Sequence, residues 1–450
     1  MPPRFLFRLF PLAARVSRWL EQRFTRGGRL LSGVLVSGAI LGIDISQTLA
    51  YQLAALAFAL LATSLVLTMR WRPNIEVRRV LPAMITATRS THYWLEITNH
   101  GQRLESELLL QDQLDDPPLA LQQFKALRAS HHALGANNWF DRAIGFPRWV
   151  ALRRRQRGAE LALTRLPPIA PGATVRVKLE LTALRRGWLR FVGLRVFCPD
   201  ALGLCRARRP ILLADKLLAL PRRHPMPGLR LTSARRHQTG GASLAHAVGD
   251  SQEFAALRDY APGDPRRHIH WRSFAKTGAL IVKQYQDEYF DRHALVIDTY
   301  LSDTPACFEA VIEVAASIVG STRPRDSILD LIIAGTDVLE LLVRQGRGDG
   351  QRALTYLAEA TAVVGDDFAQ VTAHMRSRIG RLASVILVLG RDDAARRALL
   401  DELRAHALPT LCLVVVAGQC ASAGDTQEPG VHWLRVDHLA ADLAALEGPR

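Results

Sequence analysis

Two apolar runs separated by a short polar turn constrain this chain more than any other feature of its sequence. Residues 30–45 read LLSGVLVSGAILGIDI, and residues 49–69 read LAYQLAALAFALLATSLVLTM. The second run is long enough to span the hydrocarbon core of a bilayer, which takes about 20 helical residues. The first run is shorter and needs Gly27 and Gly28, or local thinning of the bilayer, to cross. The sequence therefore predicts a two-helix transmembrane anchor over residues 30–70.

Arginines flank both runs, and none lies in the turn between them. Seven arginines precede the first run, and Arg70 and Arg72 follow the second. Because basic flanks are retained on the cytoplasmic side, we expect a basic cytoplasmic segment over residues 1–29 and cytoplasmic domains after residue 70. This pattern is typical of a multi-pass protein of the inner (plasma) membrane. A cleaved signal peptide or a helical pair buried in a soluble domain is the alternative interpretation.

The segment before the first run alternates arginine with large apolar residues. Residues 4–24 read RFLFRLFPLAARVSRWLEQRF. Such a pattern favours an amphipathic helix lying in the membrane interface. The segment can equally be a basic tail that only sets the orientation of the anchor.

Charge is distributed unevenly along the rest of the chain, whose overall formal charge is +16. Residues 141–236 carry 22 basic and five acidic side chains, whereas residues 287–450 carry 15 basic and 24 acidic ones. A basic domain tethered close to a bilayer is attracted to its anionic lipids. We favour this interpretation over nucleic-acid binding, because aromatic residues do not alternate with the arginines at strand spacing. An acidic protein partner is a further possibility.

The hydrophobic pattern has period two over residues 75–220, which predicts a basic, antiparallel β-sandwich-like domain. Residues 117–157 interrupt it as a long surface insertion, and no helix is expected between its strands. The expected strands are residues 75–82, 93–101, 107–115, 174–184 and 186–200.

Apolar strands alternate with helical segments over residues 291–446, which predicts an α/β domain with a mostly parallel sheet covered on both faces. Ligands of such sheets bind beyond the carboxyl ends of the strands. The first strand ends at Asp298, so we expect any site near this residue. The five cysteines are odd in number and form no CxxC pair, which favours free thiols over disulfides or a zinc site.

Residues 250–271 read DSQEFAALRDYAPGDPRRHIHW and concentrate charged side chains. We expect a short helix over residues 253–260, a type II turn at Pro262-Gly263, and bonds from Asp264 to nearby backbone amides. Residues 267–275 should run extended or as a turn into a helix, and residues 279–286 should form a strand.

Three roles are open for this stretch. In a strand, His268 and His270 share one face and can chelate a metal ion, although no third ligand is evident. Asp264 with either histidine can perform acid–base catalysis, as in a hydrolase. Ion pairs that join two domains are the interpretation we favour, and they would involve Glu253, Arg258, Asp264 and Arg267. No catalytic residue is assigned, because GxSxG, HExxH, P-loop and GxGxxG motifs are all missing from the sequence.

The stretch strongly resembles the signature of the DUF58 family. An upstream element, RRGWLRFVGLRVFCPDALGL, is also similar to that family's, with Ala201 where proline or phenylalanine is expected. The resemblance implies a signature segment over residues 240–290 that leads into a von Willebrand factor A-like domain over residues 291–446. It also implies a non-enzymatic scaffold or accessory role beside a MoxR-type AAA+ ATPase. The matching residues are Glu253, Phe254, Arg258, Tyr260, Pro262, Gly263, Asp264, Arg267, Ile269, Trp271, Ala275, Val282 and Lys283.

Many von Willebrand factor A domains bind Mg²⁺ through an Asp-x-Ser-x-Ser motif, and here Asp298 and Ser302 match it. Tyr300 replaces the first serine, and a tyrosine hydroxyl lies too far from its backbone for octahedral ligation at about 2.1 Å. Thr361 and either Asp392 or Asp393 are the candidates for the ligands from later loops. We therefore predict a partner-docking face without a cofactor, and Mg²⁺ at Asp298 and Ser302 is the alternative.

Overall fold

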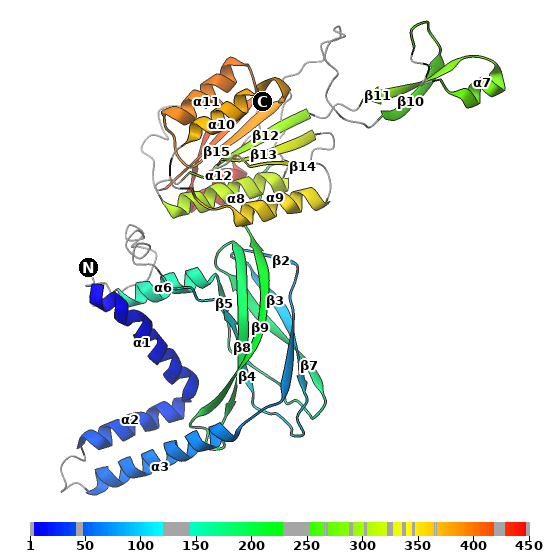
Figure 1. The fold of residues 1–450 in the computed structure, drawn as a ribbon. Helices are drawn as coiled ribbons and strands as arrows, with labels where there is room; N and C mark the ends of the chain where they lie inside the picture. The colour runs from blue at the N-terminus through cyan, green and yellow to red at the C-terminus, as the bar shows by residue number, and fades with distance from the viewer. Residues whose placement is uncertain are drawn as a thin grey trace. The chain divides into compact units, whose positions relative to one another are not determined.

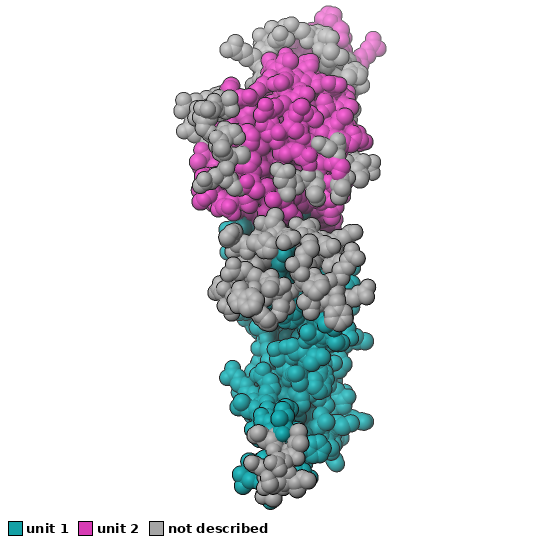
Figure 2. Space-filling model, turned by 90° about the vertical axis from the view of Figure 1, so that its left-hand side faces the viewer, with its two compact units in different colours: residues 1–222 teal, residues 223–450 magenta. Residues whose placement is uncertain are grey.

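The protein forms two compact units, residues 1–222 and residues 223–450 (Figure 2). We describe each unit by itself, from a computed structural model of the chain. The described residues are 4–41, 48–119, 145–227, 252–264, 266, 269–287, 291–300, 304–321, 327–334, 339–343, 347–363, 365, 367–417 and 428–446.

The first unit begins with three helices: α1 (Arg4–Arg23), α2 (Arg26–Leu41) and α3 (Thr48–Arg70). α2 lies along α3 (Figure 1), and small residues permit this approach, because a Cβ built on Gly38 would lie 3.1 Å from the Ala54 Cβ. Among the described helices, α3 alone is long and apolar enough to cross a membrane. Its window, Leu49–Arg70, has a mean hydropathy of 1.9, and only 22% of it is buried.

Two β-sheets follow (Figure 1), and buried side chains from both of them form one core. The alternation of the sequence sets which side chains face inward: in β7, Val177, Leu179, Leu181 and Ala183 are buried and the residues between them are not. The first sheet has the order β1 (Ile75–Val80), β3 (Ser90–Asn99), β7 (Thr174–Ala183), β5 (Ala159–Leu161). The second has the order β2 (Met84–Thr86), β9 (Arg206–Leu220), β8 (Gly187–Pro199), β4 (Leu109–Leu114), β6 (Thr164–Arg165).

The five strands expected from the sequence are present, with two departures from the prediction. β2 pairs with β9 in parallel, so the arrangement is not wholly antiparallel. The predicted surface insertion contains a helix, α6 (Phe146–Arg157), which begins after Gly145 and ends before Gly158, both with positive φ. This helix forms because Trp149 and Leu152 pack against Phe10 and Ala14 of α1, a contact that local periodicity cannot reveal.

The second unit contains a six-stranded sheet whose helices cover both faces (Figure 1). Its order is β14 (Leu339–Val343), β13 (Ser327–Ala334), β12 (Asp291–Asp298), β15 (Ser384–Leu389), β16 (Thr410–Val416), β17 (Val431–Arg435). All neighbours are parallel except β13 and β14. One face carries α8 (Pro305–Ser321), α9 (Arg347–Glu359) and α12 (Leu439–Ala444), and the other carries α10 (Phe368–Arg376) and α11 (Ala394–Ala405).

The strand order reverses between β12 and β15, because the chain moves outward from β12 to β13 and in the opposite direction from β15 to β16. In open α/β sheets this reversal leaves a crevice at the carboxyl ends of the two central strands, where ligands usually bind. Asp298 ends β12 at this point. The described cysteines, Cys198, Cys205, Cys307 and Cys412, are free thiols, and Cys420 lies outside the described residues.

Candidate functional site

The signature stretch forms a two-stranded sheet that is separate from the six-stranded one. β10 (Gln252–Asp259) pairs antiparallel with β11 (Ile281–Asp287), and α7 (Trp271–Thr277) lies between them in the chain. We call residues 252–287 the signature arm. The helix predicted over residues 253–260 is wrong, because the backbone of this segment pairs with β11 instead. Short segments take their conformation from such pairing more than from their own propensity.

The turn of the signature arm has the predicted chemistry. Gly263 has a φ of 108°, and the Asp264 N–H donates to the Ala261 carbonyl at 3.1 Å, which fits a type II turn with proline second and glycine third. The Asp264 carboxylate accepts the Ala261 N–H at 3.0 Å and the Arg258 guanidinium at 2.5 Å. This ion pair lies within the arm and stabilises the turn locally. The side chain of Glu253 and all of Arg267 lie outside the described residues, so the predicted ion pairs between domains stay a prediction.

The histidine at the start of α7 has a structural partner. His270 Nδ1 lies 2.7 Å from Ser273 Oγ, and the His270 N–H donates to the Ile281 carbonyl at 2.8 Å. These bonds fix the first turn of α7 against β11. Arg267, His268 and the side chains of Glu253 and Phe254 lie outside the described residues, so the predicted histidine pair stays a prediction.

The signature arm has only a small core, and several of its apolar side chains face solvent. Ile269 and Val282 are buried, whereas 61% of Trp271 is exposed, and Trp271 stacks edge-on against the partly exposed Phe274 at 6.1 Å. Leu257 and Leu280 are exposed as well, and Tyr260 and Lys283 are half-buried. We call Leu257, Trp271, Phe274 and Leu280 the arm patch.

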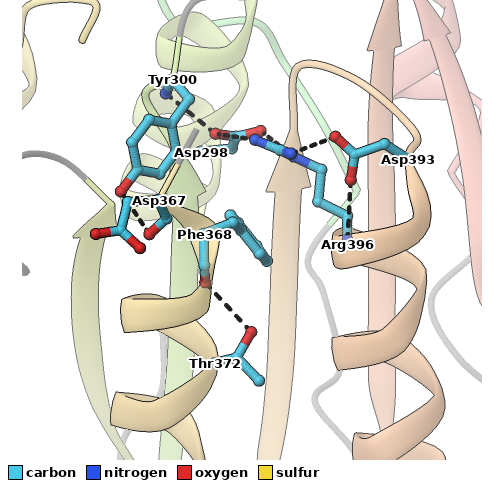
Figure 3. Close-up of polar contacts among 7 residues, drawn as sticks. All are labelled: Asp298, Tyr300, Asp367, Phe368, Thr372, Asp393 and Arg396. Atoms are coloured by element: carbon cyan, nitrogen blue, oxygen red, sulfur yellow. Dashed lines mark hydrogen bonds and ion pairs between the residues drawn. The ribbon is translucent and has the colours of Figure 1, made fainter. Parts of the chain in front are cut away.

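At the reversal of strand order in the second unit, an arginine neutralises the carboxylate of Asp298, the candidate metal ligand of the alternative interpretation (Figure 3). Arg396, from the first turn of α11, is 1% exposed. Its Nε and Nη2 donate to the two Asp298 carboxylate oxygens at 2.8 and 3.3 Å. Its Nη1 also pairs with Asp393, which caps α11 by accepting the Arg396 N–H at 3.1 Å.

Two buried aromatic side chains, Tyr300 and Phe368, lie beside this cluster. The ring of Phe368 lies 4.6 Å from the Arg396 guanidinium carbon, and Tyr300 donates its hydroxyl to the Asp367 carbonyl at 2.8 Å (Figure 3). The Tyr300 N–H donates to Asp298 at 3.1 Å. Tyr300 is therefore buried beside Asp298, with its ring packed in the core of the second unit.

The residues present do not fit a Mg²⁺ ion at this place. Mg²⁺ requires oxygen ligands arranged octahedrally, whereas a buried guanidinium already binds both oxygens of Asp298. Asp392 pairs with Arg397, Thr361 is exposed, and Ser302 lies outside the described residues. Among the described residues, no three His, Cys, Asp or Glu side chains lie close enough to hold a metal ion.

A third conspicuous site joins α1 and α2 to the β-sheets of the first unit. Asp200 accepts the N–H groups of Leu202, Leu204 and Cys205 at 2.8–3.1 Å, which fixes the turn between β8 and β9. The Thr25 N–H donates to the Leu204 carbonyl at 3.0 Å. The upstream element PDALGL thus holds the junction between α1 and α2, a role that sequence reasoning missed.

Gly28 is required for this contact, since a Cβ at this position would lie 2.0 Å from the Leu204 carbonyl oxygen. We expect Gly28→Ala to separate the junction from the β8–β9 turn and to expose the amides of residues 202–205 to hydrogen exchange. Gly33→Ala, in the same helix with nothing within 4 Å of its Cβ, is the matched control. Hydrogen–deuterium exchange on the full chain measures both, and equal exchange in the two variants would contradict the assigned contact.

These observations define a class: a protein with one apolar helix able to cross a membrane, a two-sheet β unit, and a doubly wound α/β unit with an arginine at its strand switch. The family described as "Protein of unknown function DUF58" matches residues 256–415, which include most of the signature arm and the Asp298–Arg396 cluster.

A curated relative and two solved structures are similar to parts of the chain. "Uncharacterized protein YeaD" of Bacillus subtilis (strain 168) is 25% identical over 224 residues, which span 48% of this chain and 54% of YeaD, about half of each. The manganese-loaded TRAP protein of Plasmodium vivax is 15% identical, with a TM-score of 0.26, over 34% of this chain and 74% of that one. A GH20 exo-β-N-acetylglucosaminidase of Vibrio harveyi is 10% identical, with a TM-score of 0.17, over 78% and 58%. Both TM-scores are too low to support an argument about function.

Proposed function

We propose that the protein is a membrane-anchored, non-enzymatic accessory protein that docks a cytoplasmic protein partner through its signature arm. The arm patch is the observation that carries this proposal. A two-stranded sheet is only marginally stable in water without a covering element, and exposed clusters of large apolar side chains mark interaction sites. Aromatic residues that fill a pocket of the partner supply most of the binding energy at such surfaces.

The charges beside the arm patch indicate the chemistry of the partner. Arg272 and Lys276 are exposed on α7, and Lys283 is half-buried on β11. A partner surface with an apolar pocket and a carboxylate rim complements them, and such complementarity raises the rate and specificity of association. The family resemblance suggests a MoxR-type AAA+ ATPase as this partner.

The membrane part of the proposal is a two-helix hairpin of α2 and α3 with the rest of the chain in the cytoplasm of the inner membrane. Its support is the apolar, mostly exposed α3 and the arginines on both flanks of the pair. The strand order of the second unit, with an antiparallel edge strand, favours a von Willebrand factor A-like domain. In that domain, Arg396 takes the place beside Asp298 that a cation has in metal-binding members.

Docking is tested with the double variant Trp271→Ala/Phe274→Ala of the full chain. We expect its affinity for a purified MoxR-type ATPase from the same organism to fall at least 30-fold, since buried aromatic anchors contribute about 2 kcal/mol or more. The matched control is Leu339→Ala/Tyr356→Ala, which removes two exposed apolar side chains elsewhere in the second unit. Equal affinities of the two double variants, measured by biolayer interferometry in detergent, would reject the arm patch as the docking surface.

A further inference from the structure

The first unit exposes an apolar stripe that partner docking does not use. Along α1, large apolar side chains recur every three or four residues on one face, and the opposite face, with Phe10 and Ala14, is buried against α6. A stripe at this spacing forms one continuous apolar side of a helix. The stripe consists of Leu9, Leu12, Val16, Trp19 and Leu20.

Beside the stripe, arginines of β8 and β9 meet at a neutral side chain of α1. Arg195 and Arg208 both donate to the Gln22 amide oxygen, at 3.1 and 3.4 Å. Arg206 donates to the Glu21 backbone carbonyl at 3.3 Å, while the Glu21 carboxylate accepts from Ser17 on its own helix. Within the described part of the chain, none of the three arginines forms an ion pair with a carboxylate.

The electrostatics of these arginines indicate positive charge that is not compensated. Burial, followed by the charges of Arg208 and Arg18, lowers the pKa of the Arg195 guanidinium from its ordinary value. Burial and the charge of Arg29 lower the pKa of Arg206. An anion bound beside them would oppose both shifts, because an opposite charge favours the charged form of a guanidinium.

A cleft lies where the stripe and the arginines meet. It has a volume of about 290 Å³ and is lined by Trp19, Gln22, Arg23, Arg208 and Pro210. Its position is fixed relative to α2, because Thr25 hydrogen-bonds to the β8–β9 turn, Gly28 lies against the same turn, and α2 begins at Arg26. The cleft therefore lies at the start of a helix of the proposed membrane anchor.

We infer that the cleft between α1 and β9 binds the phosphate of an anionic phospholipid while the apolar stripe of α1 lies in the headgroup region of the same leaflet. This inference rests on the membrane attachment proposed above. The stripe supplies apolar burial at the boundary with the acyl chains, the arginines supply attraction to the anionic headgroup, and Trp19 is of the residue type enriched at this depth.

The headgroup site is tested on the full chain by native mass spectrometry, with titration of phosphatidylglycerol or phosphatidylcholine in detergent. We expect preferential retention of phosphatidylglycerol and a roughly 30-fold weaker affinity in Arg23→Gln/Arg208→Gln, which removes the two arginines that line the cleft, as two basic groups at an anionic surface imply. Arg78→Gln/Arg89→Gln removes two exposed arginines of the same unit and should bind like the wild type. Equal loss in both double variants, or equal retention of the two lipids, overturns the site.

The position of α1 is tested separately in lipid nanodiscs that contain acyl-chain-brominated phosphatidylglycerol. We expect the brominated lipid to quench tryptophan fluorescence of the wild type, and to quench it less in Trp19→Phe. Equal quenching in the two proteins overturns the placement of the stripe. Inorganic phosphate that binds as tightly as the lipid would identify a free-phosphate site and overturn the lipid as the occupant. These measurements need no protein partner, so the lipid site can be confirmed even if the arm-patch test fails. If the chain does not enter nanodiscs, both the membrane anchor and this inference are overturned.

Discussion

Replacement of Arg396 by methionine is expected to lower the free energy of unfolding of the second unit by about 3–5 kcal/mol, because it leaves a buried carboxylate without its counter-ion. Asp298 is 1% exposed, and Arg396 supplies two of the hydrogen bonds to its carboxylate. Methionine fills much of the same volume and donates none. Pulse proteolysis over a urea gradient measures the loss on the full chain, provided that fragments of each unit are followed separately, because a chain of two units need not unfold in one step.

Arg397→Met is the matched control, since the adjacent arginine pairs with Asp392 at the surface and its own side chain is 65% exposed. This control should leave stability unchanged within error. Addition of Asp298→Asn to Arg396→Met should restore part of the loss, because the unpaired charge disappears. If Arg396→Met unfolds at the same urea concentration as Arg397→Met, the buried ion pair does not stabilise the unit as argued.

The same cluster predicts how divalent cations affect the protein. A ligand that binds only the folded state raises the free energy of unfolding of the protein, in proportion to the logarithm of the ligand concentration. Because the guanidinium binds the Asp298 carboxylate, Mg²⁺ should not raise the unfolding midpoint of the wild type. If the unfolding midpoint of the wild type rises with Mg²⁺ and that of Asp298→Asn does not, Asp298 binds the cation and the argument against a metal site is wrong.

Replacement of Arg79 by methionine is expected to destabilise the first unit by a similar amount, about 3–5 kcal/mol. The guanidinium of Arg79, on β1, binds both carboxylate oxygens of Asp112, on β4, at 3.0 and 2.7 Å, and the two side chains are 0% exposed. It also binds Asp215, on β9, at 2.5 Å, and Tyr93 donates its hydroxyl to Asp112 at 2.7 Å. Arg79 and Tyr93 belong to one sheet and the two aspartates to the other, so the cluster fixes how the two sheets pair.

Burial and the neighbouring Asp112 charge raise the pKa of Tyr93, so its hydroxyl keeps the proton that it donates to Asp112. Arg78→Met, one residue earlier and exposed on the same strand, is the control and should have little effect. The measurement is again pulse proteolysis of the full chain, now with fragments of residues 1–222. A loss in Arg79→Met no larger than in Arg78→Met would show that the sheets pair without this ion-pair cluster.

Sequence periodicity located most of the strands and helices but not all of their partners. The alternation over residues 75–80 puts Arg79 on the same inward side as Val77, which is a signal for a buried arginine, although it does not identify Asp112. The segment of residues 253–260 contains residues compatible with either helix or strand, and pairing with β11 decides for the strand. The motif at Asp298 located the strand switch at the end of β12 from the sequence. It did not identify the partner of Asp298, because Arg396 lies 98 residues further along the chain.

The sequence by itself determined the apolar helices with their arginine flanks, the period-two segment, the alternation of strands and helices, and the Pro-Gly turn, because each depends on residues close together in the chain. The tertiary structure alone decided that Arg396 binds Asp298, that Arg79 joins two sheets, and that Gln22 lies between Arg195 and Arg208. Each of these contacts joins segments far apart in the chain. Local periodicity says only that a side chain faces inward, whereas its partner depends on which strands and helices pack together.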